Sequence, residues 1–162
     1  MLVSAIAAGL LVGLAFRGDI RRIASVHFRW LVLFCIALAL RLISTAPLGE
    51  TNQRLLYVFS LFLLVVFTFV NWKVPAAPLA TLGIASNAAV VALHEGAMPV
   101  SSAAVEARGV GGAGDPLHII TADPSPFGDV LVIPPFGVYS VGDLLLAVAV
   151  LIFIVESMRT PK

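Results

Sequence analysis

The chain has 162 residues, of which 60% are hydrophobic and only 12% charged, and its mean hydropathy is +1.05. These values exclude an ordinary soluble domain and predict an all-α membrane protein that forms one domain over residues 1–162. The net charge of +1 comes from a few scattered basic residues, so no nucleic-acid partner is expected. The lone cysteine, Cys35, lies in an apolar segment, which excludes an intrachain disulfide and a cysteine-based metal site.

The first apolar segment, residues 2–16, is short for a membrane helix, but a bilayer can thin around a short span. Basic residues follow this segment instead of preceding it, which favours a retained helix over a cleavable signal peptide. Gly9 and Gly13 have the spacing that lets two helix backbones approach closely. We expect them to pack within one helix bundle, and a homodimer through these glycines is the alternative.

A short amphipathic helix at the membrane surface is predicted over residues 17–27, because its apolar residues share one face and its arginines the other. The second span, residues 28–43, begins with Arg29 and Trp30 as interfacial anchors. The third span, residues 55–70, is followed by Trp72 and Lys73, which mark another interface.

The fourth span, residues 79–94, is rich in Ala, Gly and Ser, so we expect it at the centre of the bundle. Gly83, Asn87, Val91 and His94 recur at offsets of three or four and share one helical face. Asn87 lies near mid-span, where a buried amide needs partners on neighbouring helices. It is either a packing clasp or part of a functional site.

Residues 95–138 form the one sizeable polar loop, with a short helix expected at 103–107 and a turn at 108–116. The glycines of residues 109–114 match a dinucleotide-binding pattern, but no predicted strand precedes them and no helix follows, so this match is set aside. Pro134 and Pro135 break the next apolar stretch, which predicts an interfacial or re-entrant hairpin over residues 130–137. The fifth span covers residues 141–155.

The distribution of Lys and Arg predicts the orientation of these five spans. With the N-terminus outside, the outer segments hold only Arg54 and Arg108, with Arg41 close by. The cytoplasmic segments then hold Arg17, Arg21, Arg22, Arg29, Lys73, Arg159 and Lys162. We therefore expect an inner-membrane protein of a bacterium with its C-terminus inside and its polar loop outside.

Asp129 and Asp143 are the candidate catalytic residues. An ionised carboxylate near mid-bilayer costs roughly 2.5–3.5 kcal/mol, so both must lie near an interface, line a cavity, or be protonated. Two close carboxylates can share a proton and activate water, which would make the protein an intramembrane aspartyl hydrolase. The structural alternative for Asp143 is a helix-start capping box with Ser140. Asp129 could instead cap the hairpin or pair with Arg54 or Arg108.

His94 ends the fourth span, where a partly charged imidazole suits the negative end of the helix dipole. Four residues of the outer loop could in principle form a metal site: His94, Glu95, Asp115 and His118. They lack a tight ligand spacing such as His-x-x-x-His, so we expect neither a metal nor a cofactor.

Several elements together resemble one family of bacterial membrane proteins, DUF5317. These elements are Arg17-Gly18-Asp19 before a basic segment, Asn87 followed by His94-Glu-Gly-Ala-Met-Pro-Val100, the loop around His118, Gly128-Asp129-Val130 and Ser140-Val-Gly-Asp143-Leu. In that family the first Gly-Asp pair usually runs directly into Ile-Pro, whereas Leu131 and Val132 intervene here. The resemblance implies an architecture and a membrane location, and it implies no reaction.

The function expected from these observations is that of a non-catalytic accessory or ligand-binding module. Its outer loop would close over a polar pocket lined by Asn87, His94, Asp129 and Asp143. The alternative is the aspartyl hydrolase that uses Asp129 and Asp143. A transporter or channel would need polar residues on several spans, and outside the fourth there are almost none. The expected partners are the lipid bilayer and a membrane protein or second copy.

Overall fold

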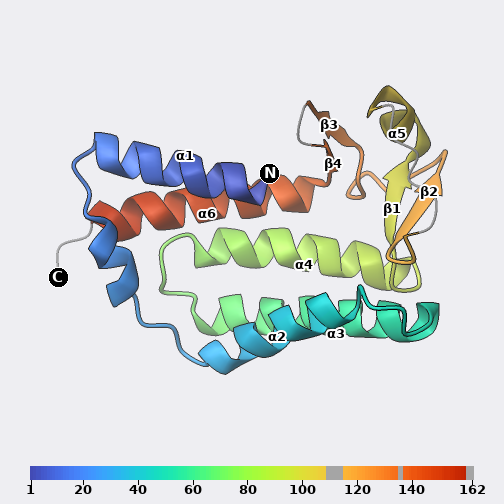
Figure 1. The fold of residues 1–162 in the computed structure, drawn as a ribbon, viewed down its shortest axis with the longest axis horizontal. Coiled ribbons are helices and arrows are strands. Elements are labelled where there is room, and N and C mark those ends of the chain that lie inside the picture. The colour runs from blue at the N-terminus through green and yellow to red at the C-terminus, as the bar shows by residue number, and fades with distance from the viewer. Residues whose placement is uncertain (109–114, 135–136, 160–162) are drawn as a thin grey trace.

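The structure, a computed structural model, describes residues 1–108, 115–134 and 137–159 and is mostly helical (Figure 1). Its five long helices are α1 (Leu2–Ala15), α2 (Leu31–Ile43), α3 (Glu50–Val70), α4 (Ala77–Leu93) and α6 (Val141–Arg159). Each coincides with one expected apolar segment. The bounds differ where polar residues extend a helix, as at Glu50, which suits the positive end of the dipole in the first turn of α3.

The helices pack in the order α1, α6, α4, α3, α2, each against the next (Figure 1). Consequently α1 and α2, which are consecutive in the sequence, lie on opposite sides of the bundle. A short 3₁₀ helix, η1 (Ile20–Ser25), lies in the chain that links them, at one end of the bundle. The surface helix expected over residues 17–27 is thus limited to six residues.

Close packing of α1 on α6 depends on the small residues of α1. A Cβ atom at Gly9 would lie 3.1 Å from Cβ of Ile154, and one at Gly13 would overlap the sulfur of Met158. This confirms the expectation that the two glycines serve packing within one bundle. Their face of α1 is occupied by α6 of the same chain.

The start of α2 is fastened to the end of α3 by Asn71, which is 4% exposed. The backbone N–H of Arg29 donates to Oδ1 of Asn71 at 2.7 Å. Nδ2 of Asn71 donates to the carbonyl oxygens of Arg29 at 2.9 Å and Phe67 at 2.8 Å. One buried amide therefore satisfies three backbone groups near two helix ends.

A small mixed structure covers the other end of the bundle, and we call its described residues between 95 and 139 the end cap. It contains β1 (Met98–Ser101), α5 (Ser102–Arg108), β2 (His118–Thr121), β3 (Leu131–Ile133) and β4 (Gly137–Tyr139). Strands β1 and β2 are parallel, with Met98 opposite His118, whereas β3 and β4 form an antiparallel pair. The helix expected at 103–107 is confirmed by α5. The glycine-rich residues 109–114 and Pro135 lie outside the described residues.

The chain is mostly helical, as the all-α prediction requires, and the two small sheets are an addition that was not predicted. Their strands are only three or four residues long, too short to show a period-2 pattern in the sequence. The predicted hairpin over residues 130–137 is formed by β3 and β4 as paired strands. The core continues from the helices into the end cap, because Tyr57, Val91, Met98 and Leu117 belong to one buried cluster.

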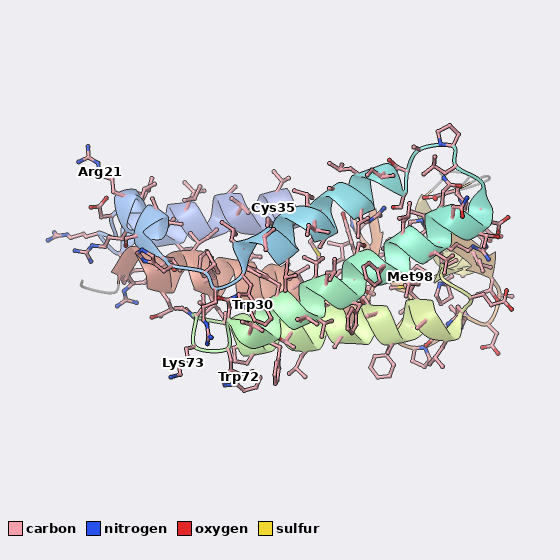
Figure 2. All side chains as sticks on the ribbon, turned by 90° about the horizontal axis from the view of Figure 1, so that it is seen from below. Arg21, Trp30, Cys35, Trp72, Lys73 and Met98 are labelled. Atoms are coloured by element: carbon pink, nitrogen blue, oxygen red, sulfur yellow. The ribbon has the colours of Figure 1, made fainter. Side chains whose placement is uncertain are left out.

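Two helices, α3 and α6, are long and apolar enough to cross a membrane. The other three long helices are apolar but shorter, with 14 residues in α1, 13 in α2 and 17 in α4. Many side chains point outward along the helices (Figure 2). Large apolar ones are among the exposed residues, with Val3 79% exposed and Phe62 56% exposed. By length and composition, two of the five long helices could therefore cross a membrane.

Candidate functional site

A hydrogen-bonded network joins α4 to the start of α6 through Asn87, Ser140 and Asp143. Nδ2 of Asn87 donates to Oδ1 of Asp143 at 2.9 Å, and the hydroxyl of Ser140 donates to Oδ1 of Asn87 at 2.9 Å. Ser140 is fully buried and Asn87 is 9% exposed. The amide of Asn87 thus uses both its donor and its acceptor ends to hold α6 in place.

The capping box predicted at the start of α6 is confirmed. The backbone N–H of Asp143 donates to Oγ of Ser140 at 3.0 Å, and the backbone N–H of Ser140 donates to Oδ2 of Asp143 at 3.2 Å. Both oxygens of the Asp143 carboxylate therefore accept a hydrogen bond. Its negative charge also lies in the first turn of α6, where the helix dipole stabilises it.

Two glycines allow this network to form where α4 crosses α6. A Cβ atom at Gly83 would lie 2.6 Å from the carbonyl oxygen of Gly142. A Cβ atom at Gly142 would lie 2.5 Å from the carbonyl oxygen of Gly83 and would overlap Oδ1 of Asn87. Only hydrogen fits at either position, so the approach of the two backbones is set by these residues.

Asp129 is held beside β1 by its backbone. Its N–H donates to the carbonyl oxygen of Pro99 at 2.9 Å, and its own carbonyl oxygen accepts from the N–H of Ser101 at 3.0 Å. The side chain is buried, and its Oδ1 atom has no hydrogen-bond partner among the described residues. The other oxygen, Oδ2, lies 4.0 Å from Nε2 of His118, which is beyond hydrogen-bond distance.

The expected pairing of Asp129 with Arg54 is wrong. Arg54 pairs with Glu50 one turn earlier in α3, at 2.5 Å, and its Nε donates to the carbonyl oxygen of Pro116 at 3.0 Å. The side chain of Arg108 lies outside the described residues.

The imidazole of His118 lies between Asp129 and a second carboxylate, Asp115. Nδ1 of His118 lies 2.7 Å from Oδ2 of Asp115, and the backbone N–H of Leu117 donates to Oδ1 of Asp115 at 2.9 Å. Burial raises the pKa of Asp115, but the hydrogen bonds from Leu117 and His118 outweigh it, so the pKa is lower than usual. An ionised Asp115 only accepts hydrogen bonds, which places a proton on Nδ1 and directs Nε2 toward Asp129.

The carboxyl group of Asp129 is much less acidic than usual. Burial raises its pKa, the negative charge of Asp143 raises it further, and His118 lowers it, with the result at about 7. A proton on Asp129 is therefore held more tightly than on an exposed aspartate, and the charge of Asp143 contributes to this.

Within the described part of the chain, His94 makes no hydrogen bond or ion pair with Asn87, Asp129 or Asp143. Nδ1 of His94 lies 2.7 Å from the carbonyl oxygen of Val90, within its own helix. Asn87 and Asp143 are bonded directly, and Asp129 is coupled to Asp143 by charge. Sequence reasoning did not connect Asp115 and His118 with this group, although their Asp-x-x-His spacing suits a local pair.

An open cleft of about 520 Å³ lies between the first turns of α3 and the end of α4, and its lining includes Glu50, Arg54 and Glu95. None of the residues of the Asn87 network lines it. Within the described residues no group of three or more His, Cys, Asp or Glu side chains is arranged to hold a metal ion.

Comparison with known protein families matches residues 25–155 to the model of DUF5317, described as a family of unknown function. No curated protein and no solved structure matches the chain.

Proposed function

The chain belongs to the DUF5317 family, and from that premise we propose an inner-membrane protein of bacteria that binds a ligand under its end cap without catalysing a reaction. All five long helices would cross the bilayer, and the end cap would lie on the extracytoplasmic side. The bound group would be a cation or a hydrogen-bond donor. The single observation that carries the proposal is the buried Asp129 carboxylate, one oxygen of which has no hydrogen-bond partner among the residues that the structure describes.

Five spans are supported by the apolar surface of the shorter helices as well as by α3 and α6. Leu11 of α1 is 69% exposed, and Val32 of α2 is 61% exposed. A bilayer accommodates short spans by local thinning, at modest cost per ångström of mismatch. If water surrounded these side chains, a large apolar surface would remain exposed to it, which is unusual for a soluble monomer.

The proposed orientation rests on where the charges lie along the bundle. Six basic residues lie away from the end cap: Arg17, Arg21, Arg22, Arg29, Lys73 and Arg159. In Figure 2 the labelled Arg21 and Lys73 lie away from Met98 of the end cap, and so do Trp30 and Trp72. Exposed tryptophans are typical of a membrane interface and an excess of basic residues of its cytoplasmic side, which supports an end cap on the outside.

Asp129 supports binding because a buried acceptor without a partner is costly, and a ligand that donates to it would remove that cost. The carboxyl group would then act in either of two ways. Ionised, it pairs with a cation, and protonated, it exchanges hydrogen bonds with a neutral polar group.

The aspartyl hydrolase is the second candidate, favoured by one observation, the effect of the Asp143 charge on the pKa of Asp129. A hydrolytic pair needs both carboxylates free to handle water and protons. Here Asp143 accepts hydrogen bonds on both oxygens from Asn87 and from the backbone of Ser140. The capping role of Asp143 therefore favours binding over hydrolysis.

The proposal can be tested with dicyclohexylcarbodiimide, which modifies protonated carboxyl groups in apolar surroundings. Purified protein in detergent should be modified once at neutral pH, at Asp129, as read by intact mass and peptide mapping. Asp129→Asn should abolish the modification, and Asp123→Asn, which changes an exposed carboxylate, should not.

Modification of Asp143 in place of Asp129 would contradict the proposal, because it would mean that the capping carboxylate is free. Hydrolysis would be favoured if Asp129→Asn and Asp143→Asn both accumulated normally in the membrane and both lost the same turnover. The binding proposal instead expects Asp143→Asn to lower the amount of folded protein.

A further inference from the structure

An apolar groove of about 410 Å³ is lined mainly by residues of α2, α3, α4 and α6. Its walls include Leu38 of α2, Phe67 of α3, Ala80 and Ile84 of α4, and Leu146 of α6. Leu38 is 48% exposed, so the groove reaches the outer surface of the bundle. Its volume lies within the range of small-molecule sites, about 300–1,000 Å³.

Three polar side chains line the groove, and two of them are satisfied internally. The hydroxyl of Thr68 donates to the carbonyl oxygens of Leu64 and Val65, at 3.0 and 3.1 Å. Asn71 is bonded to the backbone of Arg29 and Phe67, as described above. Neither is therefore available to a ligand.

The third polar residue is Arg41, the one charged side chain of the lining. Its guanidinium group lies over the ring of Tyr57, 4.6 Å from the ring centre, and Nη1 donates to Oγ of Ser44 at 3.3 Å. Among the described residues no carboxylate lies within 4.0 Å of it. A guanidinium group has five N–H donors, so most of its capacity to bind an anion is unused.

The position of Arg41 gives the groove a direction. It lies in the last turn of α2, toward the end cap, while Phe153, which also lines the groove, lies beyond the middle of α6 on the way to the opposite end. An apolar groove with a cation at one end matches a molecule that has a hydrocarbon chain and an anionic head group.

We propose that this groove binds an anionic phospholipid of the surrounding bilayer, with one acyl chain along the groove and its phosphate against Arg41. The head group would then lie in the leaflet on the side of the end cap. Arginine suits a phosphate because its planar donors can form two parallel hydrogen bonds. The inference takes from the proposed function only the membrane location and does not involve Asp129.

The test is competition between two lipids with identical acyl chains, phosphatidylglycerol and phosphatidylcholine, on protein purified in a non-ionic detergent. Native mass spectrometry should show one tightly held phosphatidylglycerol per chain, preferred over phosphatidylcholine by on the order of fivefold. Arg41→Gln should remove the preference, and Arg41→Lys should keep part of it.

A second pair of variants tests the groove itself. Ala80→Phe fills the groove and should reduce the binding of both lipids. Ala89→Phe, which adds the same ring at an exposed position of the same helix, should leave both unchanged. Asp129→Asn should also leave lipid binding unchanged, which separates this inference from the proposed function.

Equal retention of the two lipids by the unaltered protein would overturn the inference without any variant. A preference for phosphatidylglycerol that persists in Arg41→Gln would also overturn the inference, because another residue would then recognise the charge of the head group. Loss of lipid in both Ala80→Phe and Ala89→Phe would equally count against a site in the groove.

Discussion

Asn87 on α4 and Asp143 on α6 are joined by a 2.9 Å hydrogen bond, the direct polar link between the two helices that carry the candidate site. The same amide accepts from Ser140, which precedes α6. The capping box of α6 and the packing of α6 on α4 are therefore one structure. A change in Asn87 alters both.

We predict that Asn87→Ala destabilises the protein by about 1–3 kcal/mol, because Ser140 and Asp143 each lose a partner while buried or partly buried. Thermal unfolding in detergent measures the change. Asn52→Ala is the control, since Asn52 is exposed and its side chain bonds locally, to the carbonyl oxygen of Leu48 just before α3. When Ser140→Ala and Asn87→Ala are combined, the loss of unfolding free energy should differ from the sum of the two single losses. A loss equal to that sum would contradict a single network.

Gly142→Ala should destabilise the protein by about 1–3 kcal/mol or more, because the new methyl group meets backbone at Gly83 and displaces the Asn87 amide. Gly9→Ala is a graded comparison, since its methyl group meets only the side chain of Ile154. Unfolding temperatures of the two variants should differ clearly. Equal losses would mean that the α4–α6 crossing is looser than this geometry requires.

The pKa of Asp129 predicts a pH dependence of stability. The folded protein keeps this proton up to a pKa of about 7, whereas the unfolded chain releases it near the ordinary aspartate pKa of 3.8. Stability from this group is therefore present at low pH and is lost as pH rises from about 4 to about 7, by at most about 1.4 kcal/mol per pH unit.

Asp129→Asn should flatten this dependence, because the amide does not ionise. Thermal unfolding at pH 5 and pH 8 should show a smaller difference for the variant than for the unaltered protein. Asp123→Asn, at an exposed site in the end cap, should leave the difference unchanged. The same pH dependence in both proteins would mean that Asp129 is not buried as described.

Glu95 follows α4 in the left-handed conformation, with φ at 56°. The N–H of Gly96 donates to the carbonyl oxygen of Val91, so Glu95 occupies the position where helix ends usually have glycine. Glu95→Gly should stabilise the protein by on the order of 0.5–1 kcal/mol. Glu95→Ala retains the Cβ and should bring no such gain in stability. An equal gain in Glu95→Ala would mean that loss of the Glu95 charge, and not of its Cβ, stabilises the protein.

The proposed orientation predicts which residues a membrane-impermeant maleimide reaches. In a Cys35→Ser background, Asp123→Cys in the end cap should be labelled in intact spheroplasts. Lys73→Cys, between α3 and α4, should be labelled only after permeabilisation. Both positions are exposed, so labelling reports the side of the membrane. The reverse pattern would invert the orientation.

The sequence predicted the long helices well, because continuous apolar runs and their polar boundaries determine where such helices form. It also predicted the Ser140–Asp143 capping box, since that motif is local. The strands of the end cap were not predicted, because they pair residues that are distant in the sequence, such as Met98 and His118. Strands this short also have no distinctive period.

The candidate site was predictable in part. The face shared by Gly83 and Asn87 indicated a close approach by another helix, but not which helix. The proximity of Asp129 to His118 depends on the parallel pairing of β1 with β2 and on the backbone bonds of Asp129 to Pro99 and Ser101. Contacts of this kind follow from the fold and not from spacing.

The packing of α1 on α6 constrains how the chain is made. α1 leaves the ribosome before α6 does, so α1 has no packing partner of this kind until α6 has been made. Meanwhile α2, α3 and α4 can associate in the order in which they emerge. The glycine face of α1 therefore stays without its partner while α2, α3 and α4 are made, and it is covered only once α6 arrives.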